Sequence, residues 1–151
     1  MHIRRYTESD LESVWRLHNE ALLSTGAHFG NGPWDEDLRN IEKTYIETGG
    51  EFLVGVIDGE MAAMGALKKT SEKSAEIRRM RILPAYQGRG LGREMLSALE
   101  STALRLGFTH IHLDTSVRQT AAVALYTKHG YRVTGRGRIR DLDILYFEKY
   151  L

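Results

Sequence analysis

Three glycines stand at alternate positions in the middle of the chain, at Gly88, Gly90 and Gly92. They follow a strand-like run, residues 75–83, that ends before Pro84, and they precede a helical pattern. Glycine leaves backbone N–H groups uncovered and readily adopts positive φ, and a helix start adds the positive end of its dipole. The run therefore predicts an anion site that suits a phosphate or pyrophosphate. The alternative is a glycine loop that only turns the chain before a packing helix.

The spacing of the glycines indicates which of the known phosphate-binding motifs this run matches. A dinucleotide-binding fingerprint needs its third glycine three residues after the second, but Gly90 is followed by Gly92 and then Arg93. A P-loop needs Gly-Lys-Ser/Thr, which this run lacks. The run Gln87-Gly88-Arg89-Gly90-Leu91-Gly92 instead resembles the Gln/Arg-x-x-Gly-x-Gly/Ala signature of the GNAT superfamily of N-acetyltransferases, which hold the pyrophosphate of acetyl-coenzyme A on these amides.

Two further stretches carry the same resemblance. Residues 122–131, Ala-Val-Ala-Leu-Tyr-Thr-Lys-His-Gly-Tyr, are similar to the family's Ala-x-x-Leu-Tyr-x-Lys-x-Gly-Phe/Tyr block. Residues 80–84, Met-Arg-Ile-Leu-Pro, look like the strand that these enzymes place before the loop. The resemblance covers residues 51–134, and it implies acetyl-coenzyme A as cosubstrate.

The resemblance also implies which residues bind the cofactor. The N–H of Met80 would serve the thioester carbonyl or oxyanion, and Ile82 would pair with a pantetheine amide. Arg89 would add a side-chain contact to phosphate, unless it is only a solvated arginine at a helix start. Gln119 stands where the family usually has asparagine, which leaves one polar contact to the cofactor arm in doubt. The full predicted set is Met80, Arg81, Ile82, Gln87, Gly88, Arg89, Gly90, Leu91, Gly92, Gln119 and Tyr126.

Acetyl transfer needs a base, because an amine with a pKa near 10.4 is protonated at neutral pH. Glu76 lies eleven residues before Gln87, the spacing of the catalytic glutamate in histone acetyltransferases of this superfamily. Strand alternation would put Glu76 on the face of Met80 and Ile82 unless a bulge intervenes. The alternative is a structural ion pair with Arg78, which would lower the pKa of Glu76.

The leaving thiolate benefits from an acid, and Tyr126 stands at the family's Leu-Tyr position, where the hydroxyl reaches the cofactor sulfur. The alternative is a core tyrosine with a satisfied O–H group. The chain has no cysteine, and no grouping of serine, histidine and aspartate stands out. A covalent acetyl-enzyme therefore has no obvious nucleophile, and direct transfer is predicted.

The acceptor side of the site is less defined. Residues 24–34 contain three glycines and a proline and form an aromatic loop. In similar proteins the segment between the first two helices borders the acceptor pocket, so we expect Phe29 to line it and Trp34 either to line it or to pack. His28 is expected at the surface. Small amines, amino acids, aminoglycosides, peptide N-termini and protein lysines all remain open as acceptors.

Hydrophobic periodicity predicts an α+β fold. The expected strands are 2–6, 51–58, 60–70, 75–83, 108–115, 131–138 and 143–150, and the expected helices are 11–22, 35–48, 91–106 and 119–128. A strand, a long helix and another strand imply a crossover and a parallel pair. The result is a GNAT-like three-layer α/β arrangement in one domain, residues 1–151: a mixed, mostly antiparallel twisted sheet with helices on both faces. The resemblance implies that its central parallel pair is splayed.

Composition excludes several classes of protein. Without cysteine, disulfides and thiolate metal sites are excluded. The 21 Lys and Arg nearly balance the 20 Asp and Glu, which argues against nucleic acid as a partner of the whole chain. No apolar run approaches about 18 residues, so no membrane partner and a cytoplasmic location are expected. His110 and His112 share a strand face, but no third ligand accompanies them and no metal is predicted.

The sequence thus predicts a cytoplasmic N-acetyltransferase whose partners are acetyl-coenzyme A and a primary amine. One alternative is an acyl-coenzyme A-binding regulatory module without turnover, against which the presence of both Glu76 and Tyr126 argues. Another is nucleic-acid binding through the arginine-rich residues 132–140. Exposed strand edges are compatible with a homodimer, although nothing in the sequence specifies one.

Overall fold

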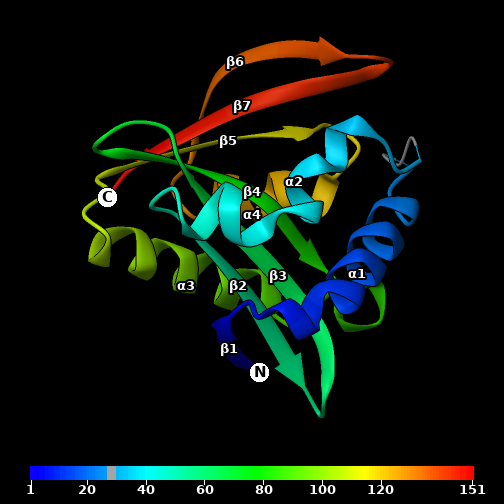
Figure 1. Ribbon diagram of the computed structural model, residues 1–151. Helices are drawn as coiled ribbons and strands as arrows, with labels where there is room; N and C mark the ends of the chain where they lie inside the picture. The colour runs from blue at the N-terminus through cyan, green and yellow to red at the C-terminus, as the bar shows by residue number, and fades with distance from the viewer. Residues whose placement is uncertain (27–29) are drawn as a thin grey trace.

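A seven-stranded sheet forms the centre of the molecule, in the strand order β1-β2-β3-β4-β5-β7-β6 (Figure 1). The computed structural model describes residues 1–26 and 30–151. The strands are β1 (His2–Arg5), β2 (Glu51–Ile57), β3 (Glu60–Lys69), β4 (Ser74–Ile82), β5 (His110–Ser116), β6 (Arg132–Ile139) and β7 (Leu142–Tyr150). The helices are α1 (Leu11–Leu23), α2 (Glu36–Arg39), α3 (Leu91–Arg105) and α4 (Thr120–Lys128), with short helical turns at η1 (Glu8–Asp10), η2 (Pro33–Asp35), η3 (Glu42–Ile46) and η4 (Pro84–Tyr86).

All neighbouring strands are antiparallel except β4 and β5, which are parallel and joined through α3. The predicted α+β architecture, with one parallel pair in a mostly antiparallel sheet, is therefore confirmed. Most predicted elements are present, with ends shifted by one or two residues. In the described ranges, no helix is long and apolar enough to cross a bilayer.

The parallel pair is short. In the described chain, β4 and β5 pair only where Ser74–Glu76 lies beside His110–His112. Beyond that point β4 stays with β3, and β5 stays with β7, so the two strands move apart (Figure 1). The facing backbone groups of the later halves of β4 and β5 have no strand partner there. The splay implied by the resemblance is confirmed.

A bulge in β4 lies at the start of this opening. Arg79 and Met80 together oppose Gly65 of β3. Arg79 has a φ of 55°, which is uncommon for a residue with a side chain. A Cβ on Gly65 would lie 2.8 Å from Cδ1 of Leu99, so glycine allows α3 to approach the bulged strand closely.

The bulge reverses the predicted facing of Glu76. Met80 and Ile82 pack against the core cluster beneath α3. Glu76 and Arg78 precede the bulge on the other face of the sheet, because Arg78 pairs with Ala66, a residue of the core cluster beneath α1 and α2. The extra residue inverts the alternation, so Glu76 does not share a face with Met80 and Ile82.

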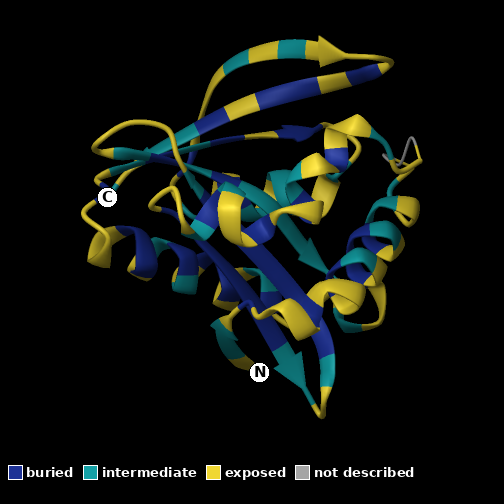
Figure 2. Cartoon of the chain, in the orientation of Figure 1, coloured by how far each residue is buried: buried dark blue, intermediate teal, exposed yellow. Residues whose placement is uncertain are grey.

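Two buried clusters lie on opposite faces of the sheet, and the buried sides of α1 and α3 both face it (Figure 2). The cluster beneath α3 and α4 includes Met95, Leu99, Ile111, Tyr126 and Phe147. The cluster beneath α1 and α2 includes Val14, Leu17, Leu38, Tyr45 and Phe52. Helices on both faces were predicted, and this prediction is confirmed.

The prediction of one helix over residues 35–48 is wrong. Helix α2 ends at Arg39, and Asn40 leaves the helical conformation with φ −139° and ψ 49°. The Asn40 amide donates to the carbonyl oxygen of Glu36 at 3.3 Å, a local bond with which asparagine competes against helix continuation. The chain resumes as the π-helical turn η3 and stops at Gly49, whose φ is 96°.

Candidate active site

The glycine loop has the backbone conformation that its sequence predicts. Gly88 and Gly90 have φ values of 78° and 80°, and Gly90 caps the N-terminus of α3. A Cβ at either position would meet nothing within 4 Å, so conformation rather than space requires glycine there. Gly92 differs, because a Cβ there would lie 3.3 Å from Cδ2 of Leu125 in α4. The exposed amides at the start of α3 can thus receive an anion.

The side chains of the loop hold it against β4. The Gln87 Nε2 donates to the carbonyl oxygen of Ile82 at 3.2 Å. The Arg89 guanidinium lies 5.1 Å from the ring centre of Tyr86, and the Tyr86 hydroxyl donates to Glu60 at 2.9 Å. Arg89 remains exposed and therefore available to a phosphate.

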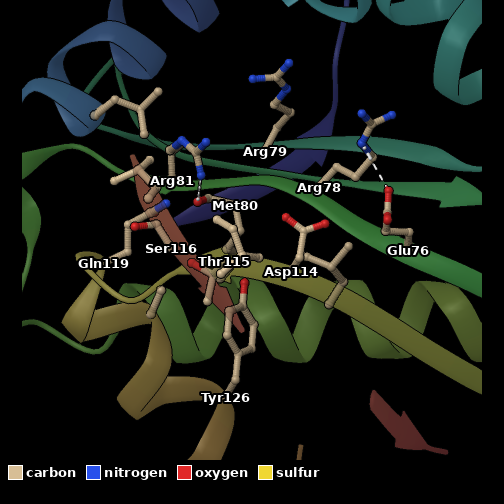
Figure 3. A pocket seen from close by; sticks show the side chains of 15 residues that line it. Glu76, Arg78, Arg79, Met80, Arg81, Asp114, Thr115, Ser116, Gln119 and Tyr126 are labelled. Atoms are coloured by element: carbon tan, nitrogen blue, oxygen red, sulfur yellow. Dashed lines mark hydrogen bonds and ion pairs between the residues drawn. The ribbon is translucent and has the colours of Figure 1, made fainter. Parts of the chain in front are cut away.

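A cavity of about 300 Å³ lies where β4 and β5 separate (Figure 3). Its walls come from β4, β5 and α4, with contributions from α1 and β7. The lining residues are Leu22, Glu76, Ile77, Arg78, Arg79, Met80, Arg81, Asp114, Thr115, Ser116, Gln119, Ala122, Tyr126, Leu142 and Ile144. Glu76, Tyr126, Met80, Arg81 and Gln119, all predicted from the sequence, therefore meet in one cavity.

Glu76 forms the ion pair considered for it and also has a raised pKa. Its carboxylate lies 3.2 Å from Nε of Arg78 and 4.0 Å from Nδ1 of His112. Burial nevertheless raises the pKa of Glu76, and the charge of Asp114 raises it further, against the opposing charges of Arg78 and His112. The ion pair that the sequence predicted is present, but its predicted lowering of the pKa is outweighed.

Tyr126 is buried, with an exposed fraction of 3%, and its ring packs edge-on against Tyr131 at 5.4 Å. Its hydroxyl points into the cavity (Figure 3). No hydrogen bond of this hydroxyl is found among the described residues. Burial raises the pKa of Tyr126, so the hydroxyl keeps its proton at neutral pH.

Arg79 was not predicted as a site residue. Its guanidinium crosses to α2 and η2, where Nε donates to Asp37 at 2.9 Å, Nη1 to Asp35 at 3.2 Å and Nη2 to the carbonyl oxygen of Trp34 at 2.7 Å. Tyr45 donates to Asp37 as well. These buried bonds tie the bulge of β4 to the segment after α1. The sequence signal was the acidic run Asp35-Glu36-Asp37, but its distance from Arg79 in the chain concealed the contact.

Arg81 lies just beyond the bulge and faces the α1 side of the sheet, because it pairs with Met64 of the cluster beneath that helix. Its Nη1 donates to the carbonyl oxygen of Met80 at 2.9 Å, whereas its buried Nε has no hydrogen-bond partner among the described residues. Burial and the charge of Arg79 lower the pKa of Arg81 to about 10.

Of the two predicted acceptor residues, Trp34 is the one that the structure describes. Trp34 is 45% exposed and does not line the cavity; its ring lies 4.3 Å beneath the guanidinium of Arg140. Phe29 and His28 lie outside the described residues. Leu22, Leu142 and Ile144 line the cavity from α1 and β7, and a sequence without the sheet order could not bring them together.

His110 and His112 have structural partners. Their rings stack at 5.7 Å, His110 bonds to Ser74 and Glu148, and His112 bonds to Thr70. The part of the chain that the structure describes contains no group of three or more residues able to hold a metal ion.

Comparison with known proteins identifies the family. The sequence matches the model of the acetyltransferase (GNAT) family over residues 11–131. The chain belongs to this family. IAA acetyltransferase of Azospirillum brasilense is 32% identical to this chain over 100 residues, which cover 66% of this chain and 63% of that relative. The N-acetyltransferase YjgM of Escherichia coli is 25% identical over 134 residues, which cover 85% and 80% of the two chains.

Solved GNAT structures share the fold over nearly the whole chain. A GNAT acetyltransferase from Staphylococcus aureus superposes with a TM-score of 0.90 at 19% identity, covering 99% of this chain and 98% of that one. The acetyltransferase yncA from Salmonella typhimurium, solved with acetyl-CoA, superposes with a TM-score of 0.82 at 24% identity, covering 99% and 93%. The predicted fold and the predicted class, an acyltransferase, are confirmed.

Proposed function

We propose that this GNAT protein transfers the acetyl group of acetyl-CoA directly to a primary amine. The observation that carries the proposal is the opening between β4 and β5 next to a glycine loop with positive φ. The unpaired edge of β4 can bind an extended pantetheine arm, while the amides at the start of α3 bind the pyrophosphate. Support comes from yncA, solved with acetyl-CoA, and from PaiA of Thermoplasma acidophilum, solved with coenzyme A.

The cofactor contacts follow from the strand and the loop. Ile82 pairs through its backbone with a pantetheine amide, and the N–H of Met80 donates to the thioester carbonyl. Amides from Gln87 to Gly92 hold the pyrophosphate, with the first turn of α3 at Leu91. Arg89 adds charge to this site. Gln119, at the start of α4 and on the cavity wall, contacts the cofactor arm.

Glu76 acts as the base in this proposal. Neutral pH lies about 3.4 units below the pKa of a lysine-like amine, so removing the proton from its ammonium form costs roughly 4 to 5 kcal/mol. The raised pKa of Glu76 suits proton removal near neutral pH, directly or through a water molecule. The neutral amine then attacks the thioester carbon, and a C–N bond forms.

The C–S bond breaks as the tetrahedral intermediate collapses. The N–H of Met80 stabilises the negative oxygen of this intermediate. Tyr126 donates its proton to the departing thiolate, since its hydroxyl is protonated and points into the cavity. The nitrogen loses its extra proton to solvent, and Tyr126 regains a proton and Glu76 releases one by exchange with solvent, so the products are the N-acetylated amine, coenzyme A and one proton.

Calorimetric titration with acetyl-CoA tests the proposal. We expect micromolar binding by the wild type and loss of binding in Gly90→Asp, which combines backbone strain with a negative charge at the pyrophosphate site. The matched control is Gly107→Asp, at a φ of 91° beyond the other end of α3, where the strain is similar but affinity should be unchanged. No binding by the wild type, or equal binding by Gly90→Asp, would contradict the proposal.

A second assay follows release of the coenzyme A thiol with a panel of amines. Turnover with at least one amine is expected. Binding of acetyl-CoA with no amine acetylated would instead support the regulatory module without turnover.

A further inference from the structure

Among the three arginines that line the cavity, Arg81 is the one without an ion pair to a described carboxylate. Arg78 faces Glu76, and Arg79 is bound to Asp35 and Asp37. For Arg81, the described residues provide no carboxylate within ion-pair distance, and its one hydrogen bond goes to the neighbouring Met80 carbonyl.

This arrangement is unfavourable without a ligand. The Nε of Arg81 is withdrawn from water and has no hydrogen-bond partner among the described residues, and a hydrogen-bonded anion would compensate for this lost hydration. Asp35 and Asp37 act on Arg81 through space, but both are bound to Arg79. An arginine remains charged at neutral pH even when its pKa is lowered to about 10. The cavity therefore contains a prepared site for an anion.

The anion is not the phosphate of the cofactor. Helix α3, whose N-terminus follows the glycine loop, packs on the sheet face that carries Met80 and Ile82. Arg81 projects from the opposite face, towards the cluster beneath α1. Its guanidinium is thus directed away from the pyrophosphate site and towards the acceptor side.

The other end of the cavity is acidic. Glu76 and Asp114 both line it, and the charge of Asp114 acts on Glu76. Figure 3 shows these two carboxylates on one side of the cavity, and Arg81 on the other with Ser116 and Gln119. The two ends therefore complement a molecule with a positive and a negative group.

We propose that Arg81 binds a carboxylate of the acceptor, and that the acceptor is a free amino acid whose ammonium group lies towards Glu76 and Asp114. This inference rests on the proposed acetyl transfer. The guanidinium matches a carboxylate through two parallel N–H bonds, and the hydroxyl of Ser116 and the amide of Gln119 lie on the same side of the cavity. A cavity of about 300 Å³ suits a small molecule of this kind. A polyamine lacks the carboxylate, and so does the side chain of a lysine within a protein.

The test compares each of the twenty amino acids with its own carboxamide as acceptor, with acetyl-CoA saturating and thiol release as the readout. The carboxamide keeps the amine and the side chain but removes the negative charge. We expect kcat/KM for the preferred amino acid to exceed that for its carboxamide by about 10- to 100-fold, as for a charged hydrogen bond. Most of the difference should lie in KM.

Three variants assign the preference to Arg81. Arg81→Met should reduce the ratio of acid to carboxamide to about one, whereas Arg81→Lys, which keeps the charge without the fork, should retain part of it. The matched control is Arg78→Met, which removes a guanidinium of the same strand and cavity but one already paired with Glu76. Its rate can change, but its ratio should stay at the wild-type value. Titration with the N-acetylated product and coenzyme A gives a readout independent of turnover, and Arg81→Met should weaken product affinity.

The outcomes separate the two claims. Carboxamides acetylated as well as acids, a preference that survives in Arg81→Met, or acetyl-CoA bound with no amino acid acetylated would each overturn the assignment to Arg81. Failure of the wild type to bind acetyl-CoA would overturn the proposed function itself, and the inference with it.

Discussion

Arg79 and Arg81 lie two residues apart on β4 and both line the cavity, but their surroundings differ. Arg79 makes bonds to two carboxylates and a carbonyl oxygen, and its side chain is 11% exposed. Within residues 1–26 and 30–151, Arg81 bonds only to the carbonyl oxygen of Met80, and its Nε is buried without a hydrogen-bond partner. The bulge between them lets one arginine reach α2 while the other stays at the opening.

The difference indicates that Arg79 has a structural role, whereas Arg81 is available to bind a ligand. A buried cation with all its partners belongs to the fold, because removing it would leave buried carboxylates unpaired. A buried cation without partners is costly to keep unless something binds there. In this molecule the paired Arg79 fixes the bulge, and Arg81, which has no carboxylate partner among the described residues, lines the cavity.

Stability provides the largest expected effect. Arg79→Met should lower the free energy of unfolding by about 3 to 5 kcal/mol, because Asp35 and Asp37 would remain buried without their cation. Urea unfolding followed by circular dichroism measures this. The matched variant Arg81→Met should change stability by less than about 1 kcal/mol, since it breaks no ion pair.

A large stability loss in Arg81→Met would contradict the contrast between Arg79 and Arg81. The Oδ2 of Asp35 is also buried without a hydrogen-bond partner in the described residues. A loss of several kcal/mol in Arg81→Met would identify that carboxylate as a structural partner of Arg81 and would remove the basis of the anion site.

The pH dependence of stability sharpens the comparison. Burial alone would raise the pKa of Asp37, but the hydrogen bonds and charge of Arg79 outweigh it and hold the pKa below its usual range. Such a carboxylate stabilises the folded state above its unfolded pKa, and the contribution is lost as pH falls through the folded pKa. The advantage of the wild type over Arg79→Met should therefore be full at neutral pH and shrink below about pH 4. An unfolding series across this range that showed a constant difference would argue against the buried pair.

Glu76 lies between these two cases, because it is paired with Arg78 as Arg79 is paired with its carboxylates, but its pKa is raised. Glu76→Gln should lower kcat/KM by about 100-fold and remove the acidic limb of the pH–rate profile. Glu100→Gln, which breaks the ion pair with Lys149 away from the cavity, should leave the profile unchanged. If the Glu76→Gln profile matched that of the wild type, Glu76 would be only the partner of Arg78.

Tyr126 provides the smallest effect. Tyr126→Phe should lower kcat by about tenfold while leaving the affinity for acetyl-CoA within about twofold, because only the proton donated to the thiolate is lost. The control is Tyr131→Phe, since the neighbouring Tyr131 hydroxyl has no hydrogen-bond partner in the described part of the chain and does not line the cavity. Equal turnover in Tyr126→Phe and the wild type would assign Tyr126 to the core alone.

Much of the fold could be predicted because its signals are local. Asp58-Gly59 marks the hairpin of β2 and β3, and the glycine after each long helix marks its end. The glycine loop and the block around Tyr126 are contiguous motifs, so the two main walls of the site were predictable from the resemblance.

What could not be predicted depends on contacts between distant parts of the chain. No sequence signal marks the bulge at Arg79, so strand alternation alone could not decide which face of β4 carries Glu76. The break at Asn40 depends on one side-chain bond that competes with a helix pattern. That no carboxylate of the described residues pairs with Arg81 can be seen only once every neighbouring carboxylate has been placed.

A crystal structure of the complex with coenzyme A tests the central claim most directly. The account predicts pyrophosphate oxygens within hydrogen-bond distance of the amides of Gly88–Gly92, the pantetheine arm along the free edge of β4, and the sulfur beside the Tyr126 hydroxyl. Coenzyme A bound outside the opening between β4 and β5 would contradict it.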